Sequence, residues 1–153
     1  MTELVLYQTL HLARGRVRHL AEHVAVLDAA SRAVFARAYA PDSPHLAARI
    51  EALAATESYP QAVSGFVRIE LTPAGDQRLL PAGVSLYDGY ALRSLTPDAV
   101  TVDYDLPLSE APTTLLEAAD LLARCRARQQ GADVAVRCDS LGQLRSAEGP
   151  PLF

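Results

Sequence analysis

The chain has 153 residues, which is enough for one domain or for one domain with part of another. Half of the residues are apolar and 21% are charged, so the chain can bury a hydrophobic core. The formal net charge of −4 argues against a general attraction to nucleic acid or to anionic membrane surfaces. All 14 basic Lys or Arg positions are arginine, so the chain contains no lysine.

The first residues lack the pattern of a secretory signal, because Glu3 interrupts the apolar stretch and no small-residue cleavage site follows. No apolar run approaches the length of a membrane span. Cys125 and Cys138 are therefore expected to be buried free thiols rather than a disulfide or a metal-binding pair. Together these features predict a cytoplasmic protein.

The N-terminal part of the chain predicts a hairpin followed by a helix. Residues 3–13 and 16–19 are rich in strand-forming side chains, and the Arg-Gly pair between them suits a tight turn. Residues 20–39 have apolar side chains at helical spacing, with charged side chains on the opposite face. We therefore expect two antiparallel strands that lead directly into an amphipathic helix.

The middle of the chain predicts a second helix and three strands. The helix covers residues 43–56, with Ser43 as the capping residue and a proline in its first turn. Residues 64–72 and 99–106 alternate between apolar and polar side chains, as half-buried strands do. Residues 79–87 contain a proline and a glycine, which favours an edge strand or a bulged strand.

The C-terminal third predicts a helix that begins at Thr113 or Thr114 and ends near Gln130. A proline precedes this helix and a glycine follows it, which are typical start and stop signals. Residues 132–138 and 143–146 follow as two strands joined by a turn. Because the strands and helices do not alternate regularly, the order of elements predicts an α+β fold.

Histidine and serine residues offer little evidence of a catalytic or metal site. His19 and His23 are four residues apart and could meet on one helix face, but a third metal ligand is missing, so we expect a packing role. Ser31, Ser64 and Ser85 do not have the sequence context of a nucleophile elbow, so no hydrolase triad is predicted.

Two charged groups each have two interpretations. Four acidic residues are compatible with a hard-cation site or with a solvated strand face: Asp98, Asp103, Asp105 and Glu110. Arg124, Arg126 and Arg128 are compatible with an anion-binding patch or with a solvated helix face. Asp120 is spaced to pair with Arg124 along the helix. We expect solvated surfaces in both cases, and no metal site.

Three stretches of the chain contain motifs whose order is informative. Residues 7–31 contain Thr-Leu, a Gly turn and Glu-His-x-x-x-Leu. Residues 65–72 read GFVRIELT. Residues 131–153 contain Gly-Ala-Asp, Asp-x-x-Gly and a final Leu-Phe. This order resembles class IV pyridoxal-phosphate enzymes, the family of branched-chain and D-amino acid aminotransferases and aminodeoxychorismate lyase. The resemblance implies that residues 1–108 form the small α+β domain of the D-amino acid aminotransferase-like fold, and that residues 109–153 form the first helix and hairpin of the large cofactor domain.

Four positions depart from the pattern of that family. The resemblance places the lysine that holds the cofactor as an imine at Thr113 or a neighbour, and a hydroxyl cannot form an imine. Val26 stands where the family commonly has an arginine that binds the cofactor phosphate. Ser146 stands where the family has the glutamate that holds the pyridine nitrogen, although Glu148 follows two residues later on the same strand face. Pro151 replaces an asparagine.

The missing lysine implies a protein with no catalytic residue and no bound pyridoxal phosphate, because no other lysine exists to replace it. We expect an aminotransferase class IV-like protein that serves as a binding or assembly module. Two alternatives remain: the N-terminal part of a longer class IV aminotransferase or aminodeoxychorismate lyase-like protein, or a residual binder of small amino or keto acid anions. The candidate ligand-binding residues are Tyr7, Arg68, Arg93 and Glu148.

The predicted C-terminal hairpin would expose apolar side chains. Those that need a cover are Leu141, Leu144, Leu152 and Phe153. Large exposed apolar patches usually mark interaction surfaces. We therefore expect a homodimer, or docking to another protein chain.

Overall fold

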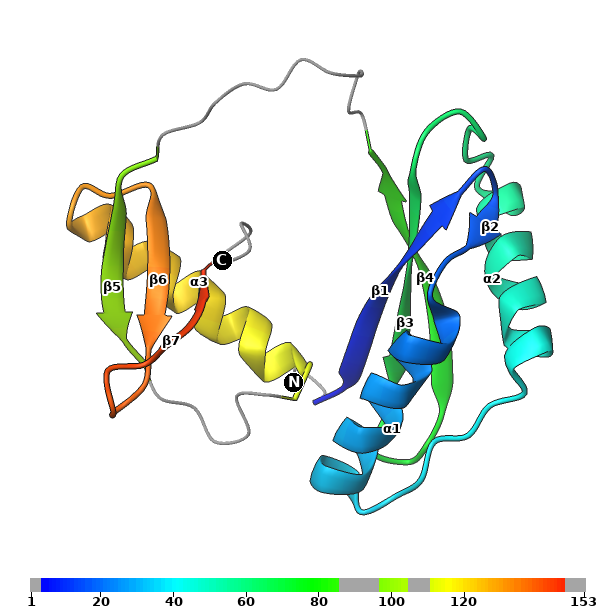
Figure 1. Cartoon of the computed structure of the whole chain (residues 1–153), viewed down its shortest axis with the longest axis horizontal. Helices are drawn as coiled ribbons and strands as arrows, with labels where there is room; N and C mark the ends of the chain where they lie inside the picture. Colours follow the sequence, from blue (N-terminus) through cyan, green and yellow to red (C-terminus); the bar gives the residue numbers. More distant parts are fainter. Residues whose placement is uncertain (1–3, 86–96, 105–110, 148–153) are drawn as a thin grey trace. The chain divides into compact units, whose positions relative to one another are not determined.

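The computed structural model describes three stretches of the chain: residues 4–85, 97–104 and 111–147. Their helices and strands form two compact units, each with its own sheet (Figure 1). The first unit consists of Met1–Tyr90 and Ala111–Thr113, and the second of Ala91–Glu110 and Thr114–Phe153.

The first unit is built on an antiparallel sheet with the strand order β2-β1-β3-β4. The strands are β1 (Leu6–Ala13), β2 (Arg16–Val17), β3 (Gly65–Leu71) and β4 (Gln77–Val84). The predicted hairpin between β1 and β2 is confirmed: Arg14 and Gly15 both have positive φ angles, 53° and 71°, as a twisted two-residue turn requires. The β1–β3 pairing runs from Leu6 opposite Leu71 to Leu12 opposite Gly65.

Two helices follow the predicted positions, with different ends. Helix α1 (Leu20–Phe35) stops before residue 39, because Ala36 takes a left-handed conformation and its N–H returns to the carbonyl of Ser31. In α2 (Ser43–Thr56) the cap is Asp42 rather than Ser43, since the Asp42 carboxylate accepts the N–H of His45 at 3.2 Å.

The core of the first unit lies between the sheet and the two helices. Alternation along the strands sends every second side chain of β1 and β3 to this face. The fully buried side chains from the strands and helices include Leu6, Leu10, Leu12, Val67, Ile69, Leu71, Leu27, Leu46 and Ile50. Burying each of these large apolar side chains is worth about 1.5–3 kcal/mol, so this layer holds the unit together.

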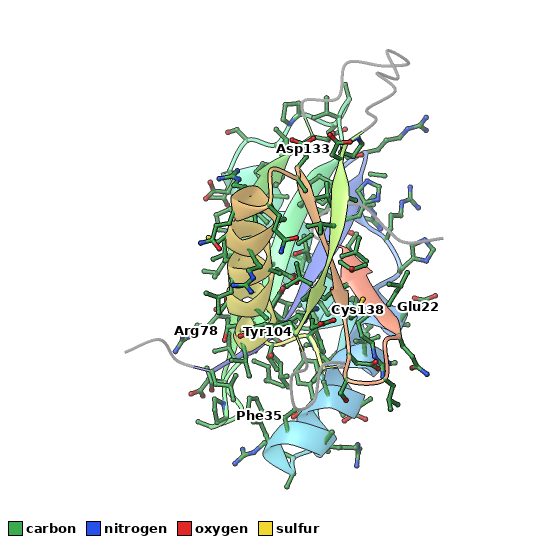
Figure 2. All side chains as sticks on the ribbon, turned by 90° about the vertical axis from the view of Figure 1, so that its left-hand side faces the viewer. Glu22, Phe35, Arg78, Tyr104, Asp133 and Cys138 are labelled. Atoms are coloured by element: carbon green, nitrogen blue, oxygen red, sulfur yellow. The ribbon has the colours of Figure 1, made fainter. Side chains whose placement is uncertain are left out.

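The second unit has a three-stranded sheet with the order β5-β6-β7 and one helix. Its elements are β5 (Ala99–Asp103), α3 (Thr114–Gln129), β6 (Val134–Cys138) and β7 (Leu144–Ala147). Asp133, labelled in Figure 2, precedes β6 and accepts the N–H of Asp98, which precedes β5, at 3.1 Å. This bond ties together the beginnings of the two strands.

Strand β5 pairs in parallel with β6, so β5, α3 and β6 form a βαβ unit. The sequence order did not predict this arrangement, because the alternating pattern of residues 99–106 suits a strand in either sheet. The pairing groups β5 with the C-terminal elements, whereas the predicted domain boundary placed residues 1–108 together. That boundary remains a prediction.

The described residues form an α+β fold with three helices and two sheets, in agreement with the expected fold class. Both cysteines are free, but only Cys138 is buried, whereas Cys125 is exposed on α3. None of the described helices is long and apolar enough to cross a membrane.

Replacing a leucine in the first core should destabilise the protein strongly. Leu10 is fully buried between the sheet and the helices, so Leu10→Ala should lower the free energy of unfolding by about 2–5 kcal/mol. Val26→Ala, on the exposed side of α1, should change it by no more than about 0.5 kcal/mol. Urea unfolding followed by circular dichroism measures both variants. Equal midpoints for the two would show that this layer does not hold the fold.

Candidate functional site

The candidate site lies on the face of the first sheet that does not pack against α1 and α2. In the register of β1 with β3, Tyr7 lies opposite Glu70, and Thr9 lies opposite Arg68. The flanking residues of both strands point into the core, so alternation places these polar side chains together on the opposite face. Strand β4 adds Arg78, which lies opposite Glu70 in the register of β3 with β4.

Arg68 is held by two contacts on this face. Its guanidinium carbon lies 3.8 Å from the centroid of the Tyr7 ring, which is cation–π geometry. Its Nε atom lies 2.9 Å from Oε1 of Glu70, and the two side chains are only 21% and 13% exposed. The result is a planar cation with a fixed orientation, the kind of group that pairs with carboxylates and phosphates.

The charge of this cluster is slightly positive. Arg68 and Arg78 contribute two positive charges, and Glu70 contributes one negative charge, which leaves +1 for the three side chains. Glu70 therefore offsets part of the attraction that Arg68 offers to an anion. The arrangement suits weak binding of a small monovalent anion better than tight binding of a phosphate.

The structure brings together two of the four predicted ligand-binding residues. Tyr7 and Arg68 are in direct contact, as described, whereas Arg93 and Glu148 lie outside the described residues. Glu70 and Arg78 were missed. The signal for Glu70 was its position two residues beyond Arg68 in an alternating strand, but its role depends on the contact with the Arg68 guanidinium.

A histidine–serine pair joins β1 to the residue that precedes β3. Nε2 of His11 lies 2.8 Å from Oγ of Ser64, and the His11 ring centroid lies 5.6 Å from that of Phe66. The Ser64 carbonyl accepts the N–H of Ser85 at 2.7 Å. These contacts tie the ends of neighbouring strands together, which is a structural role.

The remaining polar groups singled out in the sequence lie apart from this site. His23 contacts Oε1 of Gln8 through Nδ1 at 2.8 Å, and burial lowers its pKa, with a further contribution from His19. Among the described residues, no group of three or more His, Cys, Asp or Glu side chains could hold a metal ion. Asp103 is exposed, while Asp105 and Glu110 lie outside the described residues.

Thr113 occupies a structural position immediately before α3. It is 6% exposed and forms an isolated β-bridge with Leu6. The neighbouring Pro112 carbonyl accepts the N–H of Tyr7 at 2.8 Å. Residues 111–113 therefore extend the edge of β1, and the chain enters α3 directly afterwards.

Ser146 is the partner of a buried arginine. Arg137 on β6 is 3% exposed, and its Nε and Nη2 atoms donate to Oγ of Ser146 at 2.9 and 2.7 Å. The same Nε atom lies 2.9 Å from Oδ1 of Asp120 on α3. The sequence predicted that Asp120 would pair with Arg124 along the helix, which stays a prediction, whereas the structure shows Asp120 in contact with Arg137 of the sheet.

The fold is similar to part of the fold of solved class IV aminotransferases. The chain matches their solved structures over 94% of its length but spans only about 55% of theirs. No protein-family model matches the chain, and no curated protein sequence matches it.

Three of these solved structures illustrate the similarity. A hypothetical aminotransferase from Mycobacterium tuberculosis, in its PLP-bound form, has a TM-score of 0.67 and 19% identity, with 55% of its chain covered. A putative 4-amino-4-deoxychorismate lyase has a TM-score of 0.63 and 22% identity, with 57% covered. The branched-chain amino acid aminotransferase of Escherichia coli has a TM-score of 0.64 and 14% identity, with 53% covered. At these identities the likeness shows the fold alone.

The residues at the positions that motif comparison assigns to the cofactor do not fit pyridoxal phosphate. Thr113 supplies a hydroxyl where an amine is needed to form an imine. Val26, 45% exposed on α1, supplies no donor for a phosphate. Ser146 accepts hydrogen bonds from the Arg137 guanidinium. The positive charge of that guanidinium would repel a protonated pyridine nitrogen, which needs a negative partner.

The turn between β6 and β7 predicts a pH-dependent stability. Asp139 accepts the N–H groups of Gln143 and Leu141 at 2.8 and 2.9 Å, and Nε of Arg145 donates to it at 2.8 Å. These bonds, that of Gln143 foremost, lower the pKa of the Asp139 carboxyl. Because its pKa is lower in the folded state, its stabilisation is complete above the unfolded pKa of about 3.9 and is lost as the pH falls through the folded value.

Asp139→Asn should therefore destabilise the protein at pH 7, and the difference from wild type should shrink as the pH falls below about 4. Asp103→Asn, which changes an exposed carboxylate on β5, is the matched control. Urea unfolding midpoints at pH 7, 5 and 3 provide the measurement. A difference that stays constant across this range would contradict the assignment of the stabilisation to the charged carboxylate.

Proposed function

We propose that this chain is a class IV aminotransferase-like protein that carries out no imine chemistry and binds small carboxylate anions. The observation that carries the first part is the absence of any lysine, with Thr113 at the position where the family has its nucleophile. The buried Arg137–Ser146 contact supports it as well, since the resemblance puts the cofactor's glutamate at residue 146, where the structure has a serine beside a cation. We derive no reaction step that would use pyridoxal phosphate.

The finer assignment of the fold is part of this proposal. Residues 1–108 correspond to the small domain of the D-amino acid aminotransferase-like fold, and residues 109–153 to the first helix and hairpin of the large domain. The match over 94% of the chain supports this assignment, as does the coverage of only about 55% of the solved chains. The pairing of β5 with β6 indicates that residues 99–103 act with the second part.

The cluster of Tyr7, Arg68, Glu70 and Arg78 supports the second part of the proposal. Stacking on the Tyr7 ring fixes the plane of the Arg68 guanidinium. The Arg68 side chain therefore loses less conformational entropy when it binds a carboxylate. A net charge of +1 favours a small amino or keto acid with one net negative charge. The partial exposure of these side chains implies weak binding.

The first test concerns catalysis. The purified chain should show no turnover of amino acids in the presence of pyridoxal phosphate and a keto acid, and should not retain the cofactor through gel filtration. Borohydride treatment followed by peptide mapping should find reduced adduct only at the N-terminal amine, because the side chains contain no primary amine. Measurable turnover, or stoichiometric retention of the cofactor, would refute this part of the proposal.

The second test concerns anion binding. Pyruvate and 2-oxoglutarate would be titrated into the protein and followed by NMR chemical shifts. Arg68→Gln should weaken pyruvate binding about tenfold, the value of one charge-assisted hydrogen bond of about 1.5 kcal/mol. Arg32→Gln removes the same charge from an exposed ion pair on α1 and should leave binding unchanged. Identical affinities for the two variants would exclude this site.

A second candidate function follows from the coverage of the solved structures. Because the chain spans about 55% of those proteins, it is also compatible with the N-terminal part of a longer class IV aminotransferase or aminodeoxychorismate lyase-like protein. The DNA sequence beyond the codon for Phe153 tests this directly. A continuous reading frame with a second phosphate-binding loop would favour it, although Thr113 would still lack an amine.

A further inference from the structure

A small cavity lies at one end of the first unit, between the β1–β2 turn, the end of α2 and the beginning of β3, and we call it the α2 cavity. Strand β2 lies beside α2 in this region (Figure 1). The cavity has a volume of about 90 Å³, which is several times the space that one water molecule needs. Its lining includes Leu12 of the core, so it is on the helix side of the sheet, whereas Arg68 belongs to the opposite face.

Tyr59 forms a fixed wall of the α2 cavity. Its ring lies so close to the backbone of Gly65 that a Cβ atom at residue 65 would be 2.6 Å from Cδ2 of Tyr59. The Tyr59 hydroxyl donates to the carbonyl of Phe66 at 3.0 Å and accepts the N–H of Gly83 at 2.8 Å. These contacts hold the ring from both ends, so the wall exists before any ligand arrives.

Helix α2 supplies the opposite wall and the charge. Glu51, Ala54 and Ala55 all line the cavity, and they share one side of the helix because they are three and four residues apart. Among the described residues that line the cavity, Glu51 is the only one with a charged side chain. That side chain is 21% exposed, so its charge is partly removed from water and favours a cation as a partner.

The two oxygens of the Glu51 carboxylate have different partners. Oε1 accepts the N–H of Val17 at 3.2 Å, and Oε2 lies 3.1 Å from Nη1 of Arg16. The Arg16 side chain is 75% exposed, and an ion pair with such an exposed partner contributes little stability. Oε2 is therefore the oxygen that can exchange its partner. A guanidinium pairs best with both oxygens of a carboxylate, whereas an ammonium group is a compact charge that one oxygen can bind.

We propose that the α2 cavity binds a small primary amine in its ammonium form. The ammonium group pairs with Oε2 of Glu51 in place of Arg16, and the alkyl chain packs against Leu12, Ala54 and Val63, which line the cavity. Burial of the alkyl chain adds the hydrophobic contribution that the exposed Arg16 pair lacks. The proposal concerns the helix side of the sheet and does not depend on anion binding by the other face.

An NMR titration of the full chain with butylamine at pH 7, up to about 50 mM, tests the ligand class. The backbone amide signals of Gly15, Val17 and Val63 should shift with one common dissociation constant. Each methylene group from ethylamine to butylamine should tighten binding by about two- to fourfold. Butanol, which has the same chain without the charge, should bind at least tenfold more weakly. The absence of a saturable shift, or equal affinities for butylamine and butanol, would overturn the proposal.

Three variants test the role of Glu51. Glu51→Gln should weaken butylamine binding at least tenfold, and it keeps an acceptor for the N–H of Val17, so circular dichroism should report unchanged folding. Glu57→Gln is the matched control, because it removes the same charge from an exposed residue just after α2. Arg16→Gln should tighten binding about two- to fivefold, because it removes the competing cation.

The variants also give the results that would contradict this site. Equal affinities for Glu51→Gln and Glu57→Gln would exclude Glu51 as the partner of the amine. Weaker binding by Arg16→Gln would show that the arginine is part of the site rather than a competitor. Tighter binding of propylguanidine than of butylamine would refute the assignment of the ligand as an ammonium.

Discussion

The pairing of β1 with β3 is the constraint on which the first unit depends. Its register places Leu6, Leu10 and Leu12 beneath the helices, and the same alternation places Tyr7 on the other face, where Arg68 stacks on it. A shift by one residue would exchange the two sets and lose both the core and the cation–π contact. The Arg-Gly turn separately fixes the register of β1 with β2.

The two units stabilise themselves in different ways. In the first, large aliphatic side chains fill the space between a sheet and two helices. In the second, alanines bring α3 against the sheet, and a buried guanidinium links helix and strands through Asp120 and Ser146. The first unit therefore resembles an ordinary small domain, while the second relies on polar contacts and leaves leucines outside.

The sequence was most informative where structure is determined locally. The hairpin turn, both helices of the first unit and the alternation of residues 64–72 follow from turn chemistry and periodicity, which involve near neighbours. The partner of β5 could not be predicted, because its alternating pattern is the same in either sheet. For Asp120, the helical spacing indicated Arg124, but the contact with Arg137 depends on how α3 packs. At the candidate site, Tyr7 and Arg68 were anticipated, whereas the role of Glu70 required the strand register.

Two buried contacts of the structure limit which side chains residues 113 and 146 could accept. A lysine at residue 113 would place a long side chain in a position that is buried and bridged to Leu6. A glutamate at residue 146 would pair with the Arg137 guanidinium, and replacing Arg137 would leave Asp120 without its buried partner. The buried contacts at residues 113 and 146 would therefore each resist the introduction of a lysine or a glutamate.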